Sequence, residues 1–283
     1  MFRIVTDGSV DMPDQWAQDY EIDVMPLNIQ IGAQSFQEGI NITRNQFYDL
    51  VRESGVMPKT SLPSSRQVAD FYRRIAVKGD TILSIHLGSR LSGTFATIQA
   101  AAKELADQFE IYTYDSGGGS AMLAYMCRDA RLWERAGLPI QDILHRLDWI
   151  RQKVILIFTV DNLEFARLSG RVNHLQSSLS SLLNIKPIII LRDGLLDMSE
   201  KVRTRRRALE RVVELVMQAV GDKKVNVAVV HARDLPDGEE MLRRVRSLLN
   251  CRDIFLADLS IPVAAHLGPG TIGIVAYPVD EER

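Results

Sequence analysis

One stretch near the centre of the chain constrains the fold more than any other. Residues 81–87 are short and mostly apolar, which predicts a buried strand, and the Ala-rich run from about Thr94 predicts a helix. Between them lies the hydroxyl-rich loop 88–94. Because free N–H groups and a helix dipole point at such a loop, it is a candidate anion site. The alternative is that Ser92 or Thr94 only caps the helix.

Composition excludes several classes of protein. The 283 residues suffice for one large or two ordinary domains, and 46% hydrophobic residues are typical of a globular protein. A net charge of −2 gives no sign of a partner nucleic acid, and no stretch reaches the roughly 18 apolar residues of a membrane span. Cys127 and Cys251 form no CxxC pair, and the five histidines form no ligand pair. We therefore expect a cytoplasmic protein without integral membrane association, metal or cofactor.

The first half of the chain alternates strands and helices. Strands are expected at residues 2–6, 22–31 with a break at Pro26, 81–87 and 109–114. Helices are expected to begin near Asp11, Thr43, Ser65, Thr94 and Ala121. The proline-flanked residues 57–64 are expected to be an extended loop, and the glycine-rich residues 115–120 a tight turn. This order predicts an N-terminal α/β domain, residues 1–150, with a mostly parallel sheet and helices on both faces.

The second half has a different character. Strands are expected at 154–160, 226–230, 254–257 and 272–277, and helices at 161–168, 175–182, 201–217 and 239–249. Residues 185–191 and 195–198 flank an Asp-Gly pair, which predicts a β-hairpin. We therefore expect a C-terminal α+β domain with a mixed sheet, residues 151–283.

Several short motifs occur in the order typical of one family. They are residues 5–9 (Val-Thr-Asp-Gly-Ser), 58–64 (Pro-Lys-Thr-Ser-Leu-Pro-Ser), 91–94 (Leu-Ser-Gly-Thr), 114–116 (Tyr-Asp-Ser), 169–171 (Ser-Gly-Arg), 183–187 (Leu-Asn-Ile-Lys-Pro) with 193–194 (Asp-Gly), 201–203 (Lys-Val-Arg) and 266–270 (His-Leu-Gly-Pro-Gly). Over essentially its whole length the chain resembles the DegV family. It departs at Gly8, where that family usually has serine, and at Ser169, where it has glycine.

The resemblance implies a protein of two domains that holds one long-chain fatty acid in a buried tunnel between them. It assigns the carboxylate to Thr60 and Ser92, with His266 close by. It also implies that the protein, like some members, is the acyl-carrying subunit of a bacterial fatty acid kinase. That subunit presents the carboxylate to a separate ATP-binding kinase in lipid metabolism, and the fatty acid is its only ligand.

The chemistry of these residue types suits that ligand. A buried carboxylate costs several kcal/mol unless donors satisfy it, and two hydroxyls with an imidazole can do so without a full counter-charge. At about 0.8 kcal/mol per CH₂, a 16-carbon tail offers roughly 11 kcal/mol before entropy costs. We place Arg171 and Arg203 near the site as secondary contacts for an anion or a partner. The basic cluster of residues 201–211 has four interpretations. It is a solvated helix face, a neighbour of the acyl phosphate, or a patch that docks the kinase; a nucleic-acid contact ranks last.

Two enzymatic alternatives remain open. A Ser-dependent hydrolase would use Ser92 as nucleophile and His266 as base, with Asp7 or Asp115 as the orienting carboxylate. Residues 88–93 do not match the GxSxG pattern of a nucleophile elbow. A metal-dependent phosphotransferase would use Asp7, although no second carboxylate stands nearby in a recognised arrangement.

Overall fold

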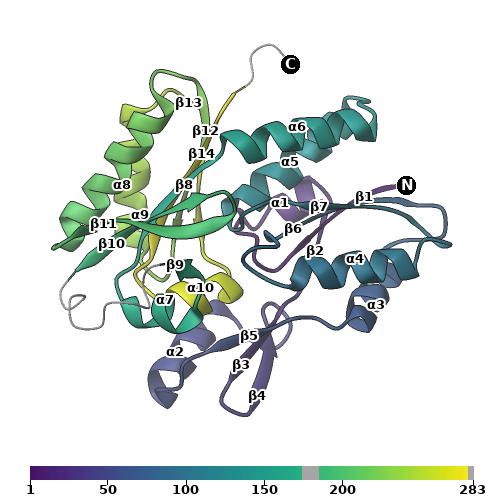
Figure 1. The fold of residues 1–283 in the computed structure, drawn as a ribbon, viewed down its shortest axis with the longest axis horizontal. Coiled ribbons are helices and arrows are strands. Elements are labelled where there is room, and N and C mark those ends of the chain that lie inside the picture. Colours follow the sequence, from purple (N-terminus) through teal and green to yellow (C-terminus); the bar gives the residue numbers. More distant parts are fainter. Residues whose placement is uncertain (174–184, 280–283) are drawn as a thin grey trace. The chain divides into compact units, whose positions relative to one another are not determined.

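The computed structural model describes residues 1–173 and 185–279, and Figure 1 shows the course of the chain. The chain forms two compact units. The first comprises Met1–Arg151 with Ser260–Pro262, and the second comprises Gln152–Leu259 with Val263–Arg283. The assignment of Ser260–Pro262 to the first unit was not anticipated from the sequence.

The first unit is built on a parallel sheet, as predicted. Its strands run in the order β2 (Ile22–Met25), β1 (Phe2–Asp7), β6 (Thr81–His86) and β7 (Glu110–Asp115). Val5 and Ile82 belong to a core with α3 (Ser65–Ile75) and α4 (Thr94–Glu104), while α5 (Ala121–Arg135) packs on β1 and β6. Helices therefore cover both faces, and the carboxyl ends of β1, β6 and β7 meet at one edge. Helix α6 (Ile140–Lys153) follows α5.

A small antiparallel sheet in the first unit refines one prediction and corrects another. The break expected at Pro26 is confirmed, and it separates two sheets: β2 ends at Met25, and β3 (Asn28–Ile31) belongs to the second sheet. There β3 lies between β4 (Gln34–Gln37) and β5 (Lys59–Ser61). The residues expected to form a loop between two prolines thus include a strand, because a short extended segment needs a partner to become one and the sequence does not reveal that partner.

Helix starts in the first unit follow their local signals in most cases. Helix α2 (Arg44–Ser54) begins after Thr43, whose side chain forms a reciprocal capping box with Gln46. Ser64 and Gln67 form the same box at the start of α3. The exception is α1, which covers only Trp16–Asp19 rather than beginning at Asp11, because the Asp11 carboxylate bonds to distant residues.

The second unit contains a mixed sheet of seven strands, which confirms the predicted architecture. Their order is β13 (Cys251–Asp258), β12 (Val225–His231), β14 (Ile272–Pro278), β8 (Ile155–Thr159), β10 (Lys186–Arg192), β11 (Leu195–Val202) and β9 (Val172–Asn173). β13 and β12 are parallel, as are β11 and β9, and the other neighbours are antiparallel.

The helices and the hairpin turn of the second unit follow the sequence, but the helix expected from Lys201 begins at Arg205, because Lys201 and Val202 belong to β11. The apolar stripes of α8 (Arg205–Val220) and α9 (Leu235–Leu248) share one core with the sheet. Asp193 and Gly194 both have positive φ, 48° and 76°, as the predicted two-residue hairpin turn requires. Short helices α7 (Leu163–Ser169) and α10 (Ile261–Leu267) complete the unit. The helix expected at 175–182 lies outside the described residues. Within the described ranges, no helix has the length and apolarity that crossing a bilayer requires.

Candidate functional site

The Ser92 loop packs against the glycine-rich turn that follows β7. The Gly88 N–H donates to the Gly118 carbonyl at an N···O distance of 2.7 Å. A Cβ atom on Gly88 would lie 2.7 Å from the Gly117 carbonyl carbon and 2.9 Å from the Gly118 nitrogen. Real Cβ atoms do not approach backbone this closely, so the two loops meet only because residue 88 is glycine. The tight-turn interpretation of residues 115–120 therefore agrees with this packing.

Asp115 ties these two loops together. Its Oδ1 atom accepts from the Ser89 N–H at 3.1 Å and from the Gly117 N–H at 2.9 Å. Its own backbone carbonyl accepts from Arg151. Asp115 therefore orders the loop that carries Ser92 by accepting hydrogen bonds from backbone N–H groups. These bonds occupy one carboxylate oxygen of Asp115, which was a candidate for the orienting carboxylate of a hydrolase.

Ser92 and Thr60 lie on neighbouring segments of the first unit. The Ser92 hydroxyl lies 2.9 Å from the Thr94 hydroxyl and accepts from the Thr94 N–H at 3.2 Å, so it makes bonds at the start of α4. Gly93 is the N-cap residue and has no side chain to offer. A Cβ on Gly93 would lie 3.0 Å from Leu62, which is two residues after Thr60 on β5. Both candidate hydroxyl residues are half-buried.

A buried chain of hydrogen bonds at the ends of β1 and β6 was not predicted. The Tyr72 hydroxyl lies 2.7 Å from the Ser84 hydroxyl, which lies 2.6 Å from Nε2 of His86. Nδ1 of His86 lies 3.0 Å from Oδ2 of Asp7. Ser9 completes the chain by donating from its N–H and hydroxyl to Oδ1 of Asp7. The only sequence signal was the polar pair Ser84 and His86 in an apolar strand.

Within this hydrogen-bond network, Ser84, His86 and Asp7 follow one another in the order of a hydrolase triad, but solvent cannot reach them. Ser84, His86 and Asp7 are each 0% exposed. Burial alone would raise the pKa of Asp7, but hydrogen bonds from His86, Ser9 and Leu87 and the charge interaction with His86 lower it. The Asp7 carboxylate, which the sequence suggested as an orienting or metal-binding group, is thus buried at the end of β1 and fully hydrogen-bonded to its neighbours. Among the described residues, no group of three or more His, Cys, Asp or Glu side chains could hold a metal ion.

A second buried carboxylate, Asp11, connects three distant segments of the first unit. It accepts from the Ser120 hydroxyl and from the Ser260 N–H. Ser120 has a φ of 61°, which is unusual for a residue other than glycine, and its N–H donates to the Ser9 carbonyl. Burial raises the pKa of Asp11 to about 6, although both hydrogen bonds oppose this shift. Asp11 therefore holds the strained start of α5.

His266 and Arg171 are neighbours in the second unit. His266 lies in the last turn of α10 rather than at the mouth of a strand, and Arg171 follows α7. A Cβ on Gly268 would lie 2.7 Å from the Phe165 ring, which shows how closely α7 and the end of α10 pack. Burial and the positive charge of Arg171 lower the pKa of His266 to about 4. At neutral pH the imidazole is uncharged and Arg171 carries the positive charge.

The basic cluster is largely neutralised by acidic partners, which corrects one expectation. The interpretation of this cluster as a solvated helix face holds for Arg206, whose side chain is 90% exposed, but not for Arg205. Instead, Arg205 is only 22% exposed and pairs with Asp234 and Asp237. The remaining pairs are Arg206–Glu210, Arg207–Glu210, Arg207–Glu214, Arg211–Glu200 and Arg211–Glu214. Arg203 is exposed between β11 and α8.

Comparison with known proteins finds relatives that match this chain over almost its whole length. The sequence model described as "Uncharacterised protein, DegV family" matches residues 1–279. A DegV domain-containing protein of Listeria monocytogenes is 32% identical over 273 residues, covering 96% of each chain. A DegV domain-containing protein of Deinococcus radiodurans is 32% identical over 286 residues, covering 98% of each.

Solved structures give the same result. A Thermus thermophilus DegV family protein described as binding fatty acid has a TM-score of 0.89 at 27% identity, covering 98% of this chain and 99% of that one. DegV of Bacillus subtilis, described as a fatty acid binding protein, has a TM-score of 0.87 at 25% identity, with the same coverage. Matches of this length and similarity, in sequence and in fold, show that the chain belongs to the DegV family.

Proposed function

We propose that this protein binds one long-chain fatty acid of the palmitate or oleate type in a buried tunnel. Its carboxylate is held by Thr60, Ser92 and His266, with Arg171 and Arg203 as secondary contacts. The observation that carries the proposal is the similarity, over 98% of the chain, to DegV proteins described as binding fatty acids. No cofactor is required, because affinity comes from the buried tail and from donors to the carboxylate.

The local chemistry supports a role for these residues with an anion. Hydroxyls of threonine and serine donate one hydrogen bond each without carrying charge. A neutral His266 retains one N–H donor, and Arg171 beside it supplies a positive charge. This combination compensates a carboxylate while leaving one oxygen able to react with a phosphoryl donor.

The proposal includes a second protein. The bound carboxylate is presented to a separate ATP-dependent fatty acid kinase, and the resulting acyl phosphate enters lipid metabolism in the cytoplasm. This protein is then the acyl-carrying, non-catalytic subunit. Mixing the loaded protein with a candidate kinase and ATP should yield an acyl phosphate, which hydroxylamine traps as a hydroxamate. If several candidate kinases from the same organism gave no hydroxamate, the carrier role would be withdrawn and fatty acid binding would stand alone.

The first experiment is mass spectrometry of an organic extract of the purified protein. We expect about one equivalent of a long-chain fatty acid, and binding of added palmitate or oleate after the protein is delipidated. An extract without lipid, combined with no binding by the delipidated protein, would overturn the proposal.

The second experiment tests the carboxylate contacts. Ser92→Ala and Thr60→Ala should each weaken fatty acid binding by roughly 10- to 150-fold, corresponding to about 1.5–3 kcal/mol for a hydrogen bond to a charged group. Ser89→Ala, in the same loop, and Ser61→Ala, next to Thr60 on β5, are the matched controls. Unchanged affinity in both test variants would mean that the carboxylate binds elsewhere.

The same variants separate carrier from hydrolase. A hydrolase that uses Ser92 and His266 would cleave an activated ester, and Ser92→Ala would abolish that turnover. The carrier predicts no turnover by the wild type. Turnover by the wild type that was lost in both Ser92→Ala and His266→Gln would favour the hydrolase.

A further inference from the structure

The turn that follows His266 is held from several sides. Gly268 and Gly270 have positive φ values of 79° and 77°, so the backbone doubles back directly after α10. The Gly270 N–H donates to the Ala232 carbonyl at 2.8 Å, and the Thr271 hydroxyl donates to the Gly268 carbonyl at 2.8 Å. A Cβ on Gly270 would lie 2.6 Å from that of Asp161, so the turn also packs closely on the end of β8.

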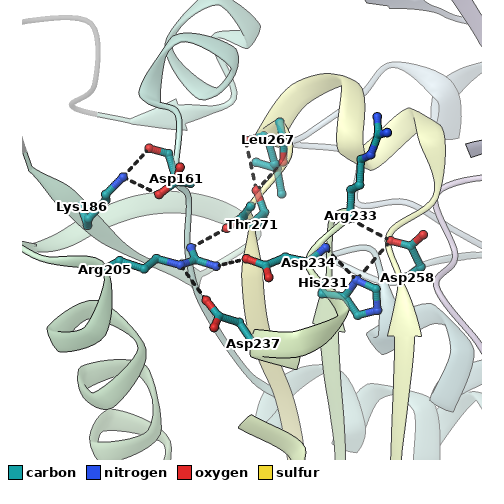
Figure 2. A network of polar contacts seen from close by, with 12 residues as sticks. Asp161, Lys186, Arg205, His231, Arg233, Asp234, Asp237, Asp258, Leu267 and Thr271 are labelled. Atoms are coloured by element: carbon teal, nitrogen blue, oxygen red, sulfur yellow. Dashed lines mark hydrogen bonds and ion pairs between the residues drawn. The ribbon is translucent and has the colours of Figure 1, made fainter. Parts of the chain in front are cut away.

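Arg205 contacts this turn from the start of α8. As Figure 2 shows, its guanidinium reaches across to the segment before Thr271 and to the first residues of α9. One nitrogen, Nη1, donates to the Gly270 carbonyl. The other two donate to carboxylates, Nη2 to Asp234 at 2.7 Å and Nε to Asp237 at 3.1 Å. One side chain therefore joins α8, α9 and the turn after His266.

The chemistry of this contact is specific to arginine. A positive charge in the first turn of a helix is unfavourable because the helix dipole is positive there, and Arg205 is the first residue of α8. Asp234 and Asp237 offset that cost. The planar guanidinium makes all three bonds at once in a fixed fork, whereas a lysine ammonium on a flexible stem has no such fixed geometry.

We propose that Arg205 is a positioning residue for His266. By holding the Gly270 carbonyl against the starts of α8 and α9, Arg205 fixes the turn of residues 268–270 and thereby the orientation of the imidazole. Its role is distinct from that of Arg171, which acts on His266 through its charge. The inference concerns the geometry of His266, and only its binding arm below rests on the proposed fatty acid function.

The direct test is the titration of His266 followed by NMR in protein labelled at histidine Cε1. The His266→Gln spectrum identifies its resonance among the five histidines. In Arg205→Lys, which keeps the charge but not the fork, we expect the His266 pKa to move toward 6.5 by on the order of one unit, because a less firmly held imidazole is better solvated. The double variant Asp234→Asn with Asp237→Asn keeps Arg205 but removes its anchors, and should give the same shift.

Arg206→Lys is the matched control, because Arg206 is the next residue on α8 and pairs only locally with Glu210 among the contacts described. It should leave the His266 resonance unchanged. If Arg205 acted only through its charge, Arg205→Lys would keep the wild-type pKa, and the proposal would be wrong. It would also be wrong if folded Arg205→Lys and Arg205→Gln melted at lower temperature but titrated like the wild type.

The binding arm compares palmitate affinity across the same variants. We expect Arg205→Lys to bind roughly tenfold more weakly than Arg206→Lys, since a misoriented donor loses most of a charge-assisted hydrogen bond. If the wild type bound no fatty acid, the proposed function would fail, while the titration would still decide the role of Arg205. Wild-type affinity in an Arg205→Lys protein with a shifted titration would remove His266 from the carboxylate site.

Discussion

His266 is half-buried near Arg171, and desolvation together with the positive charge of Arg171 lowers the pKa of the imidazole to about 4. In the unfolded chain the same group has a pKa of about 6.5. Between these values the unfolded state binds more protons than the folded state. The free energy of unfolding contributed by His266 is therefore fully present above about pH 6.5 and is lost as the pH falls toward 4.

The first prediction follows from this pH dependence of the His266 contribution to stability. His266→Gln should remove this component, so that the difference in stability between wild type and variant shrinks or reverses as the pH is lowered from about 7 to about 4.5. Urea denaturation across this range measures it. His145→Gln, at an exposed histidine, is the control and should track the wild type. A constant difference between wild type and His266→Gln would show that the pKa of His266 does not differ between the folded and unfolded states.

The stability that Asp11 contributes should change with pH in the opposite direction to that of His266. Its pKa is raised by burial to about 6, so the folded state binds more protons than the unfolded state between about pH 4 and pH 6. The stability that Asp11 contributes is present below about pH 4 and is lost as the pH rises through 6. Asp11→Asn should abolish this loss, whereas Asp14→Asn, at an exposed site, should retain it. Urea denaturation of the three proteins provides the comparison.

The contact between Gly88 and the 117–118 backbone predicts a strong effect of one methyl group. Gly88→Ala should destabilise the protein by about 1–3 kcal/mol or more, because both neighbours are backbone and cannot yield. Gly93→Ala is the control, since the added Cβ would meet only the flexible end of Leu62 at 3.0 Å. Thermal unfolding of the two variants measures the difference. Equal melting temperatures would mean that the loops separate without cost.

The buried chain from Tyr72 to Asp7 predicts unequal effects at its two ends. Asp7→Ala leaves Ser9, His86 and the Leu87 N–H without their acceptor, and should cost about 3 kcal/mol or more. Tyr72→Phe removes one terminal hydroxyl while Ser84 keeps its bond to His86, and should cost about 1 kcal/mol. Denaturation at neutral pH tests both. A larger cost at Tyr72 than at Asp7 would contradict this account of the network.

Local signals predicted most of the fold. The capping boxes at Thr43 and Ser64 and the Asp193-Gly194 turn each depend on residues within a few positions of one another. The alternation of strands and helices likewise predicted the parallel sheet of the first unit. Where a prediction failed, as at β5, the structure depended on a partner strand that is remote in sequence.

The sequence by itself determined most of the helices and strands, their order and, through the resemblance of its motifs, the DegV family. Only the tertiary structure decided which polar groups meet. His86 and Asp7 are 79 positions apart, Ser260 and Asp11 are 249 apart, and Arg205 and Gly270 are 65 apart. Hydrogen bonds and ion pairs require atoms within about 3 Å, and nothing in local periodicity encodes which distant segments approach so closely.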